Sequence, residues 1–297
     1  MNMSDPIKKD HTKQAGKKKN EILFFALRNI KFRIGVFILA FFGILALVGP
    51  LISQYDPLDY AGPGYRPPST EFWMGTSTFG QDIFSQFVHG LGSSFAVGFF
   101  GGGLATLVGL MIGFFAGYKG GWLDEILMML TNILMVIPSV ALLIIIAAYL
   151  PYRGVGIQSI IIGLTAWPWT ARAVRAQTFS LKQREFVALS RISGCKTPRI
   201  ILEEIAPNMM SYVFMVFIIQ FGGAILAAVA LDFMGLGPTL GISLGLMMQY
   251  ANLWSAIQLR MWWWFVPPGL AITLIVSALY FLNTGLDEIF NPKLREM

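Results

Sequence analysis

Long stretches without Asp, Glu, Lys or Arg dominate the chain, and their lengths match the thickness of a lipid bilayer. A hydrocarbon core of about 30 Å is crossed by about 20 apolar residues in a helix. Seven charge-free windows of about this length alternate with charged segments. The pattern predicts an all-α membrane protein. The windows cover residues 34–55, 91–118, 126–152, 154–171, 205–231, 233–259 and 261–286.

The window at 233–259 differs from the other six because it is rich in glycine and in polar side chains. Irregular backbone is tolerated at membrane depth only where protein or a cavity covers it. We therefore expect six transmembrane helices, and we interpret residues 233–260 as an outer loop with short helices. The sequence leaves open whether this loop re-enters the bilayer. Its helix-breaking and polar residues are Gly235, Gly237, Pro238, Gly241, Gly245, Gln249, Asn252 and Gln258.

Lysine and arginine gather on one side of the predicted spans. With six spans and the N-terminus inside, 19 of these residues face the cytoplasm and three, Arg66, Arg153 and Arg260, face outward. An excess of Lys and Arg marks the cytoplasmic side. We therefore expect a multi-pass protein of the inner (cytoplasmic) cell membrane with both termini cytoplasmic. The net charge of +6 then reports topology, and we expect no nucleic-acid partner.

The composition agrees with a membrane protein. Only 13% of the residues are charged and 55% are hydrophobic, whereas a soluble domain carries about 25% charged residues. The single Cys excludes a disulfide framework and a cysteine-rich metal site. The expected organisation is a basic cytoplasmic tail at 1–30, a first transmembrane helix at 31–55, an extracytoplasmic loop at 56–90, a five-helix core at 91–290 with a cytoplasmic loop at 178–207, and a cytoplasmic tail at 291–297.

Small residues recur every four positions in the second predicted span. This spacing places them along one stripe of a helix, where another backbone can approach closely. The stripe serves either packing within the chain or a contact that moves during a conformational cycle. It comprises Gly101, Ala105, Gly109, Gly113 and Gly117. Kinks are expected at the prolines within the spans, which are Pro138, Pro168, Pro267 and Pro268.

The cytoplasmic loop at 178–207 is too long to be a simple connection. Ser180 and Gln183 have the spacing of a capping box, which predicts a helix that runs from there to about Ser193. An apolar ridge on this helix has to be covered by something. Either the bundle and the lipid surface cover it, or a soluble partner docks on it. The ridge consists of Phe186, Leu189 and Ile192.

A glycine turn separates this helix from a second one. Gly194 supplies the left-handed conformation that ends a helix. Thr197 and Pro198 form an N-cap and first-turn pair that starts the second helix, and Pro207 is expected to close it. The sequence therefore predicts two short helices that meet at a sharp turn beneath the membrane.

This loop resembles the cytoplasmic signature of ABC-importer permeases, which reads Glu-Ala-Ala, three residues, Gly, and an Ile and a Pro further on. Gly194, Ile205 and Pro207 occur at matching spacings, and the segment that begins Glu185-Phe186 resembles the Glu-Tyr-Val of the peptide class. In place of the Glu-Ala-Ala the chain has Ala188, Leu189 and Ser190. The resemblance implies that the first helix inserts in a groove of a cytoplasmic ATPase subunit. The residues implied to couple to the ATPase are Glu185, Phe186, Ala188, Leu189, Ser190, Gly194, Ile205 and Pro207.

Other blocks resemble the same family in the same order. Residues 73–82 are similar to its outer motif, with Ser77 and Gln81 in place of the usual Asp and Arg. Residues 231–237 resemble its Leu-Ser-Phe-Leu-Gly-Leu-Gly segment, with Asp232 in place of Ser. Asp232 also follows a long charge-free window, which makes it a candidate for the solute pathway. The outer-motif residues are Gly75, Thr76, Gly80, Gln81 and Asp82.

The resemblance is to inner-membrane permeases of the dipeptide, oligopeptide and nickel importers, of the second (C-type) subunit. It implies the type I ABC-importer permease fold and a heterodimer with a homologous second permease, although an identical partner stays open. It also implies two cytoplasmic ATPase subunits that bind Mg-ATP and an extracytoplasmic solute-binding protein. Di- and oligopeptides are the expected solutes, and oligosaccharides or a nickel chelate are the alternatives.

Catalytic motifs are absent from the chain. It lacks the phosphate-loop pattern G-x-x-x-x-G-K-[ST], so ATP hydrolysis is assigned to partners and neither enzyme activity nor a cofactor is expected on this chain. Its two histidines, His11 and His89, predict no metal site, because such a site needs several convergent ligands. A self-contained secondary transporter or channel is the rival of another class. It predicts ionisable residues within spans, which these windows lack.

Overall fold

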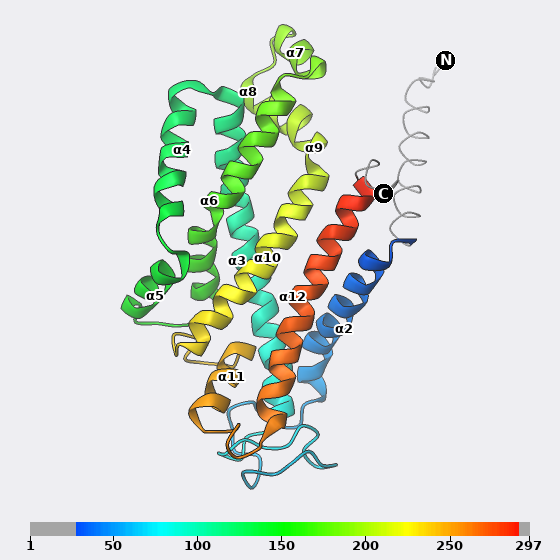
Figure 1. Cartoon of the computed structure of the whole chain (residues 1–297), viewed down its shortest axis with the longest axis vertical. Coiled ribbons are helices and arrows are strands. Elements are labelled where there is room, and N and C mark those ends of the chain that lie inside the picture. The colour runs from blue at the N-terminus through cyan, green and yellow to red at the C-terminus, as the bar shows by residue number, and fades with distance from the viewer. Residues whose placement is uncertain (1–27, 291–297) are drawn as a thin grey trace, which may run out of the picture.

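The computed structural model describes residues 28–290, which fold into helices joined by turns and loops. The short helices α7 and α8 lie at one end of the molecule, and α11 lies with the loop of residues 53–82 at the other (Figure 1). Within the described part, β pairing is limited to an isolated bridge between Thr76 and Asp82. The predicted tails fall almost wholly outside the described residues.

Most charge-free windows correspond to one helix each. The exceptions are the third window, which corresponds to the pair α4 and α5, and the window at 233–259, which contains the short helix α11. The elements are α2 (Ile30–Ile52), α3 (Ile83–Lys119), α4 (Gly121–Val136), α5 (Ser139–Tyr149), α6 (Val155–Lys182), α7 (Glu185–Ile192), α8 (Thr197–Ile200), the π-helical turn η1 (Ile201–Ile205), α9 (Ala206–Asn208), α10 (Met210–Phe233), α11 (Leu244–Leu253) and α12 (Trp262–Phe290).

The six-span count is not confirmed by the helices that the structure describes. Four of them, α2, α3, α10 and α12, are long and apolar enough to cross a membrane, and α4 with α5 makes a fifth if the bent pair is one span. The pair bends by 84° at the break beside Pro138, so the expected kink is confirmed and is larger than a straight span allows. Helix α6 is not among them; its C-terminal half carries Arg172, Arg175 and Lys182.

The loop that the sequence predicted at residues 56–90 is shorter in the structure. Helix α3 begins at Ile83, because the Asp82 carboxylate accepts a hydrogen bond from the Ser85 N–H at 2.8 Å and caps the helix. Residues 83–90 are therefore helical, although the sequence pattern predicted the second span to begin only at Leu91. Pro168, Pro267 and Pro268 lie inside continuous helices.

Helix α2 is held to the molecule by α12, along which it runs (Figure 1). A Cβ atom at Gly35 would lie 2.7 Å from the Ala278 carbonyl oxygen, so the two backbones are close. Near the start of α2, Lys31 pairs with Glu288 at 2.5 Å. Large apolar side chains on the far face of α2 are exposed, as expected for a lipid-facing helix; they are Phe37, Phe41, Ile44, Leu47 and Leu51.

The small-residue stripe of α3 packs against α6. A Cβ atom at Gly113 would lie 2.7 Å from the Ala171 carbonyl oxygen, and one at Gly109 would lie 2.4 Å from the Thr170 Cβ atom. Both distances are shorter than real Cβ contacts, so only glycine allows this approach. Packing within the chain is therefore confirmed for the stripe. Its five members, Gly101, Ala105, Gly109, Gly113 and Gly117, are all buried.

Two identical substitutions on α3 should have opposite effects on stability. In a helix, Ala is favoured over Gly by about 0.5–1 kcal/mol. Gly103 has room for a Cβ atom, with its nearest neighbour 3.8 Å away, so Gly103→Ala should raise the unfolding midpoint. Gly113→Ala should lower it, because the clash with Ala171 costs about 1–3 kcal/mol. Thermal unfolding of the purified protein in detergent measures both, and equal midpoints would contradict the close α3–α6 packing.

Candidate functional site

The elbow, which we define as α7, α8, η1 and α9, differs at its start from the sequence prediction. Helix α6 continues to Lys182, so Ser180 lies in its last turn and does not cap a new helix. The predicted capping box is therefore wrong. Helix α7 begins at Glu185, after two intervening residues, and ends at Ile192. No side chain caps its start.

The glycine turn is confirmed. Gly194 has a φ angle of +77°, and a Cβ atom there would meet nothing within 4 Å. The left-handed backbone, and not crowding, is therefore what requires glycine. Its N–H donates to the Arg191 carbonyl, and the Cys195 N–H donates to the Ser190 carbonyl at 3.2 Å, so the chain reverses there.

The second arm of the elbow is less interrupted than predicted. Helix α8 begins at Thr197 with Pro198 in its first turn, and the chain continues through η1 and α9 toward α10. Pro207 lies inside α9 and does not end the arm; the break falls at Met209. The elbow therefore leads almost directly into α10 on one side and into α6 on the other.

A compact apolar cluster holds the elbow against the bundle. Val187 of α7 and Ile205 of η1 are fully buried, together with Ile200 and Tyr118. Across the elbow, the Ser190 hydroxyl donates to the Glu204 carboxylate at 2.9 Å. These contacts fix the angle between the two arms, so α7 is positioned as a rigid part of the chain.

Cations from two helices face the ring of Tyr118, near the end of α3. The Lys182 ammonium lies 5.7 Å from the ring centroid, and the Arg191 guanidinium lies 5.9 Å from it. Contacts of this length are attractive cation–π interactions. They join the ends of α6 and α7 to α3. Nearby, Arg175 forms a bidentate pair with Asp124, with both N–O distances at 2.5 Å, and so joins α6 to α4.

Two large apolar side chains of α7 are exposed in the isolated chain. Leu189 is 65% exposed and Ile192 is 84% exposed. Phe186, the third residue of the predicted ridge, is half-buried and packs against the cluster below. The exposed part of the ridge is therefore smaller than predicted. The other implied coupling residues divide between surface and interior: Glu185, Ala188 and Pro207 are exposed, and Ser190 is half-buried.

The outer motif folds in on itself. Gly75 and Gly80 both have left-handed backbone, with φ angles of +74° and +75°. A Cβ atom at Gly80 would collide with the Gly62 carbonyl oxygen, and Thr76 is fully buried, with its carbonyl oxygen accepting a hydrogen bond from the Trp263 indole. The motif is therefore a structural support for the outer loop.

Ser77 and Gln81 bond to the molecule's own groups. The Ser77 hydroxyl lies 3.4 Å from the Gln81 side-chain oxygen, and the Gln81 amide donates to the Leu58 carbonyl at 2.9 Å. The Gln86 amide donates to the same Gln81 oxygen. A neutral network therefore occupies the place where the family pattern has an acid and a base.

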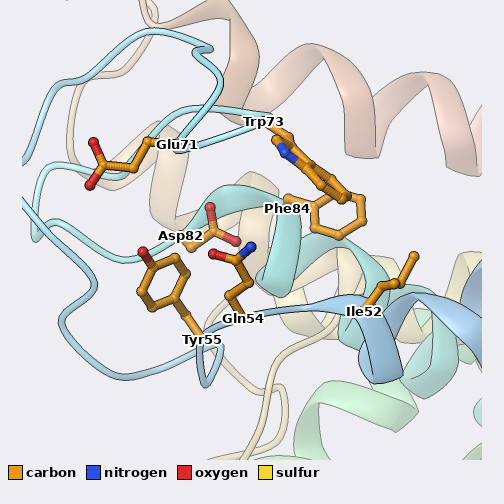
Figure 2. A pocket seen from close by; sticks show the side chains of 7 residues that line it. All are labelled: Ile52, Gln54, Tyr55, Glu71, Trp73, Asp82 and Phe84. Carbon is orange, nitrogen blue, oxygen red and sulfur yellow. The ribbon is translucent and has the colours of Figure 1, made fainter.

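Asp82 lies at a small outer pocket. Burial raises the pKa of Asp82, and the hydrogen bonds from the backbone N–H groups of Ser85 and Phe84 partly offset that rise. Figure 2 shows the Asp82 carboxyl group beside the Gln54 amide. The pocket has a volume of about 20 Å³, which is room for one water-sized group. It is lined by Ile52, Gln54, Tyr55, Glu71, Trp73, Asp82 and Phe84.

Asp232 is a second buried acid, at the end of α10. It is 1% exposed and is the penultimate residue of α10. Its carboxylate accepts hydrogen bonds from the Gln158 amide at 2.7 Å and from the Ser243 hydroxyl at 2.5 Å. The sequence pointed to Asp232 but gave no signal for its partners on α6 and beside α11. It also gave none for Tyr118 and Glu204 at the elbow.

Metal chemistry finds no support in residues 28–290. No group of three or more His, Cys, Asp or Glu side chains in this range could hold a metal ion.

Known proteins resemble the chain along most of its length. The family described as the binding-protein-dependent transport system inner membrane component matches residues 109–296. The dipeptide transport system permease protein DppC of Alkalihalophilus pseudofirmus is 34% identical, with 88% of this chain and 86% of that protein covered. DppC of Bacillus subtilis is 33% identical, with 88% and 81% covered. The oligopeptide permease OppC of Bacillus subtilis is 32% identical, with 89% and 86% covered. The chain therefore belongs to the family of inner-membrane components of binding-protein-dependent transport systems.

Proposed function

We propose that the chain is the C-type permease subunit of an ATP-driven importer of di- and oligopeptides. It pairs with a homologous second permease, two cytoplasmic ATPase subunits that bind Mg-ATP, and an extracytoplasmic binding protein. The observation that carries the proposal is the elbow: a rigidly held α7 presents exposed Leu189 and Ile192 beyond the ends of α3 and α6. The peptide permeases DppC and OppC support the solute class.

The geometry of the elbow explains how ATPase motion reaches the membrane. Leu189 and Ile192 form an apolar surface that docks in a groove of a partner. The hydrogen bond between Ser190 and Glu204 keeps the two arms of the elbow from moving independently. A push on α7 therefore displaces α6 and α10 together. Helix α6 has 28 residues, so it carries this displacement over about 42 Å.

The left-handed turn at Gly194 makes a test of coupling possible. A β-branched residue is strained there by about 1–2 kcal/mol, whereas Asn tolerates the conformation. Gly194→Val should lower ATP-driven peptide uptake by the assembled transporter at least about tenfold. The reason is that a strain of about 1.4 kcal/mol lowers the population of the correct turn about tenfold. Gly194→Asn should stay near the wild type. Uptake and ATPase rates in reconstituted vesicles measure both.

Membrane insertion is the control for these two variants, and both should insert as the wild type does. Because the Gly194 Cβ position is open, a loss of uptake in the Val variant reports backbone strain and not a clash. Equal uptake by the Val and Asn variants would contradict the coupling role of the elbow.

Cysteine labelling tests the proposed orientation. In a Cys195→Ser background, Thr70→Cys should react with an impermeant thiol reagent added to intact cells, because Thr70 is exposed on the outer loop. Ser193→Cys, exposed on the elbow, should react only after the membrane is permeabilised. In the wild-type protein, which retains Cys195, that thiol should likewise stay unlabelled in intact cells. Labelling in the reverse order would overturn the orientation.

A further inference from the structure

Asp232 joins three elements at the outer end of the molecule. Its carboxylate belongs to α10, one hydrogen-bond donor is Gln158 of α6, and the other is Ser243, the residue that precedes α11. The donors are 74 positions before and 11 positions after the acid. No Lys, Arg or His in residues 28–290 forms an ion pair with it. The acid is therefore placed to hold other elements together, and not to neutralise a cation.

The surroundings of Asp232 leave no room for a different arrangement. A Cβ atom at Gly237 would lie 2.6 Å from the carboxylate oxygen Oδ1, and one at Gly245 would lie 2.7 Å from the Asp232 Cβ atom. Two glycines of the outer segment, which we define as residues 234–261, thus close over the acid. A longer side chain at either position would displace the segment from α10.

The same acid fixes the start of α11. The Ser243 hydroxyl accepts a hydrogen bond from the Leu246 N–H at 3.1 Å and donates its own proton to Asp232. The carboxylate is thus one hydrogen bond beyond the N-terminus of a ten-residue helix, where the helix dipole favours negative charge. Leu244 and Met247, in the first turn of α11, are fully buried. The orientation of α11 therefore depends on the acid.

Gln158 connects this joint to the elbow. It lies in the first turn of α6, and Lys182 is the last residue of the same continuous helix, three residues before α7 begins. A displacement of α7 therefore arrives at Gln158 through one helix. Further ties lie at the surface: the Arg153 side chain donates to the Gly235 carbonyl at 3.1 Å, and the Thr239 N–H donates to the Arg153 carbonyl at 2.8 Å. The bonds to Asp232, in contrast, are buried and involve a charged group. Charge-assisted hydrogen bonds are about twice as strong as neutral ones.

We propose that Asp232 is a positioning residue that makes the outer segment follow α6, so that elbow motion changes the outer face where the solute arrives. The inference rests on the proposed function for its transport consequence, but its structural part stands by itself. The acid acts through Gln158 on one side and Ser243 on the other. It needs no contact with the solute.

Hydrogen exchange of the purified complex tests the structural part. Asp232→Ala should speed exchange of the amides in the first turn of α11 at least about tenfold, because Ser243 loses its partner. Asp232→Asn should show a smaller increase, since its amide oxygen still accepts from Gln158. Ser243→Ala should speed exchange there at least as much, because it removes both the bond to Asp232 and the cap on the Leu246 N–H. Asp232→Asn, which keeps the shape of the side chain, replaces Asp232→Ala if the latter does not fold.

The matched control lies deeper on the same two helices. The Gln220 amide of α10 donates to the Thr170 hydroxyl of α6 at 2.6 Å, in a buried bond that does not reach the outer segment. Thr170→Val should leave exchange in α11 unchanged. Unchanged exchange in α11 for the Asp232 variants would overturn the proposal.

The number of solute molecules transported per ATP hydrolysed tests the transport part. Gln158→Ala and Asp232→Ala should lower this ratio about tenfold in reconstituted vesicles while ATPase activity persists. Faster exchange in α11 with an unchanged ratio would overturn the proposal, because the acid would then only stabilise the fold. Absence of ATP-driven uptake by the wild type would instead refute the proposed function, and the exchange experiment would still decide the structural part.

Discussion

The close approach of α3 and α6 is the constraint on which the rest of the structure depends. In lipid there is no hydrophobic drive between helices, so contact requires small residues that let backbones meet. Gly113 provides such a contact with the Ala171 carbonyl. Because α6 carries the elbow at one end and Gln158 at the other, the position of both is set by the glycine stripe. The glycine stripe thereby determines where the elbow and the bond between Gln158 and Asp232 lie.

Features that depend on local geometry could be predicted from the sequence. The glycine stripe is a spacing, and Gly194 is a conformation that only a few residues adopt, so each carries its own signal. The capping box at Ser180 was equally local but wrong. There the neighbouring turn of α6 packs on Gly117, whose Cβ would lie 2.8 Å from the Thr178 Cβ atom, and this tertiary contact extends the helix past the cap. Local signals hold where packing does not compete with them.

Contacts between distant segments could not be predicted. The partners of Asp232 and the pairing of Ser190 with Glu204 depend on how the helices are placed, and nothing in the sequence near these residues reports it. The proline at 138 indicated a kink but not its size, because the bend depends on what α4 and α5 pack against. The six-span count was not confirmed: α6 is a 28-residue helix, but it is not among the helices apolar enough to cross a membrane.

The two departures from the family pattern in the outer half have a common physical meaning. At Ser77 and Gln81 the positions of an acid and a base in the family pattern are filled by neutral groups that bond to each other and to the Leu58 carbonyl. At Asp232 a charge occurs where the pattern has a hydroxyl, and it is met by preorganised donors and a helix N-terminus. A buried carboxylate without a cation is tolerated only where such donors are fixed in advance. The charge therefore stands where α6, α10 and the residue that precedes α11 meet.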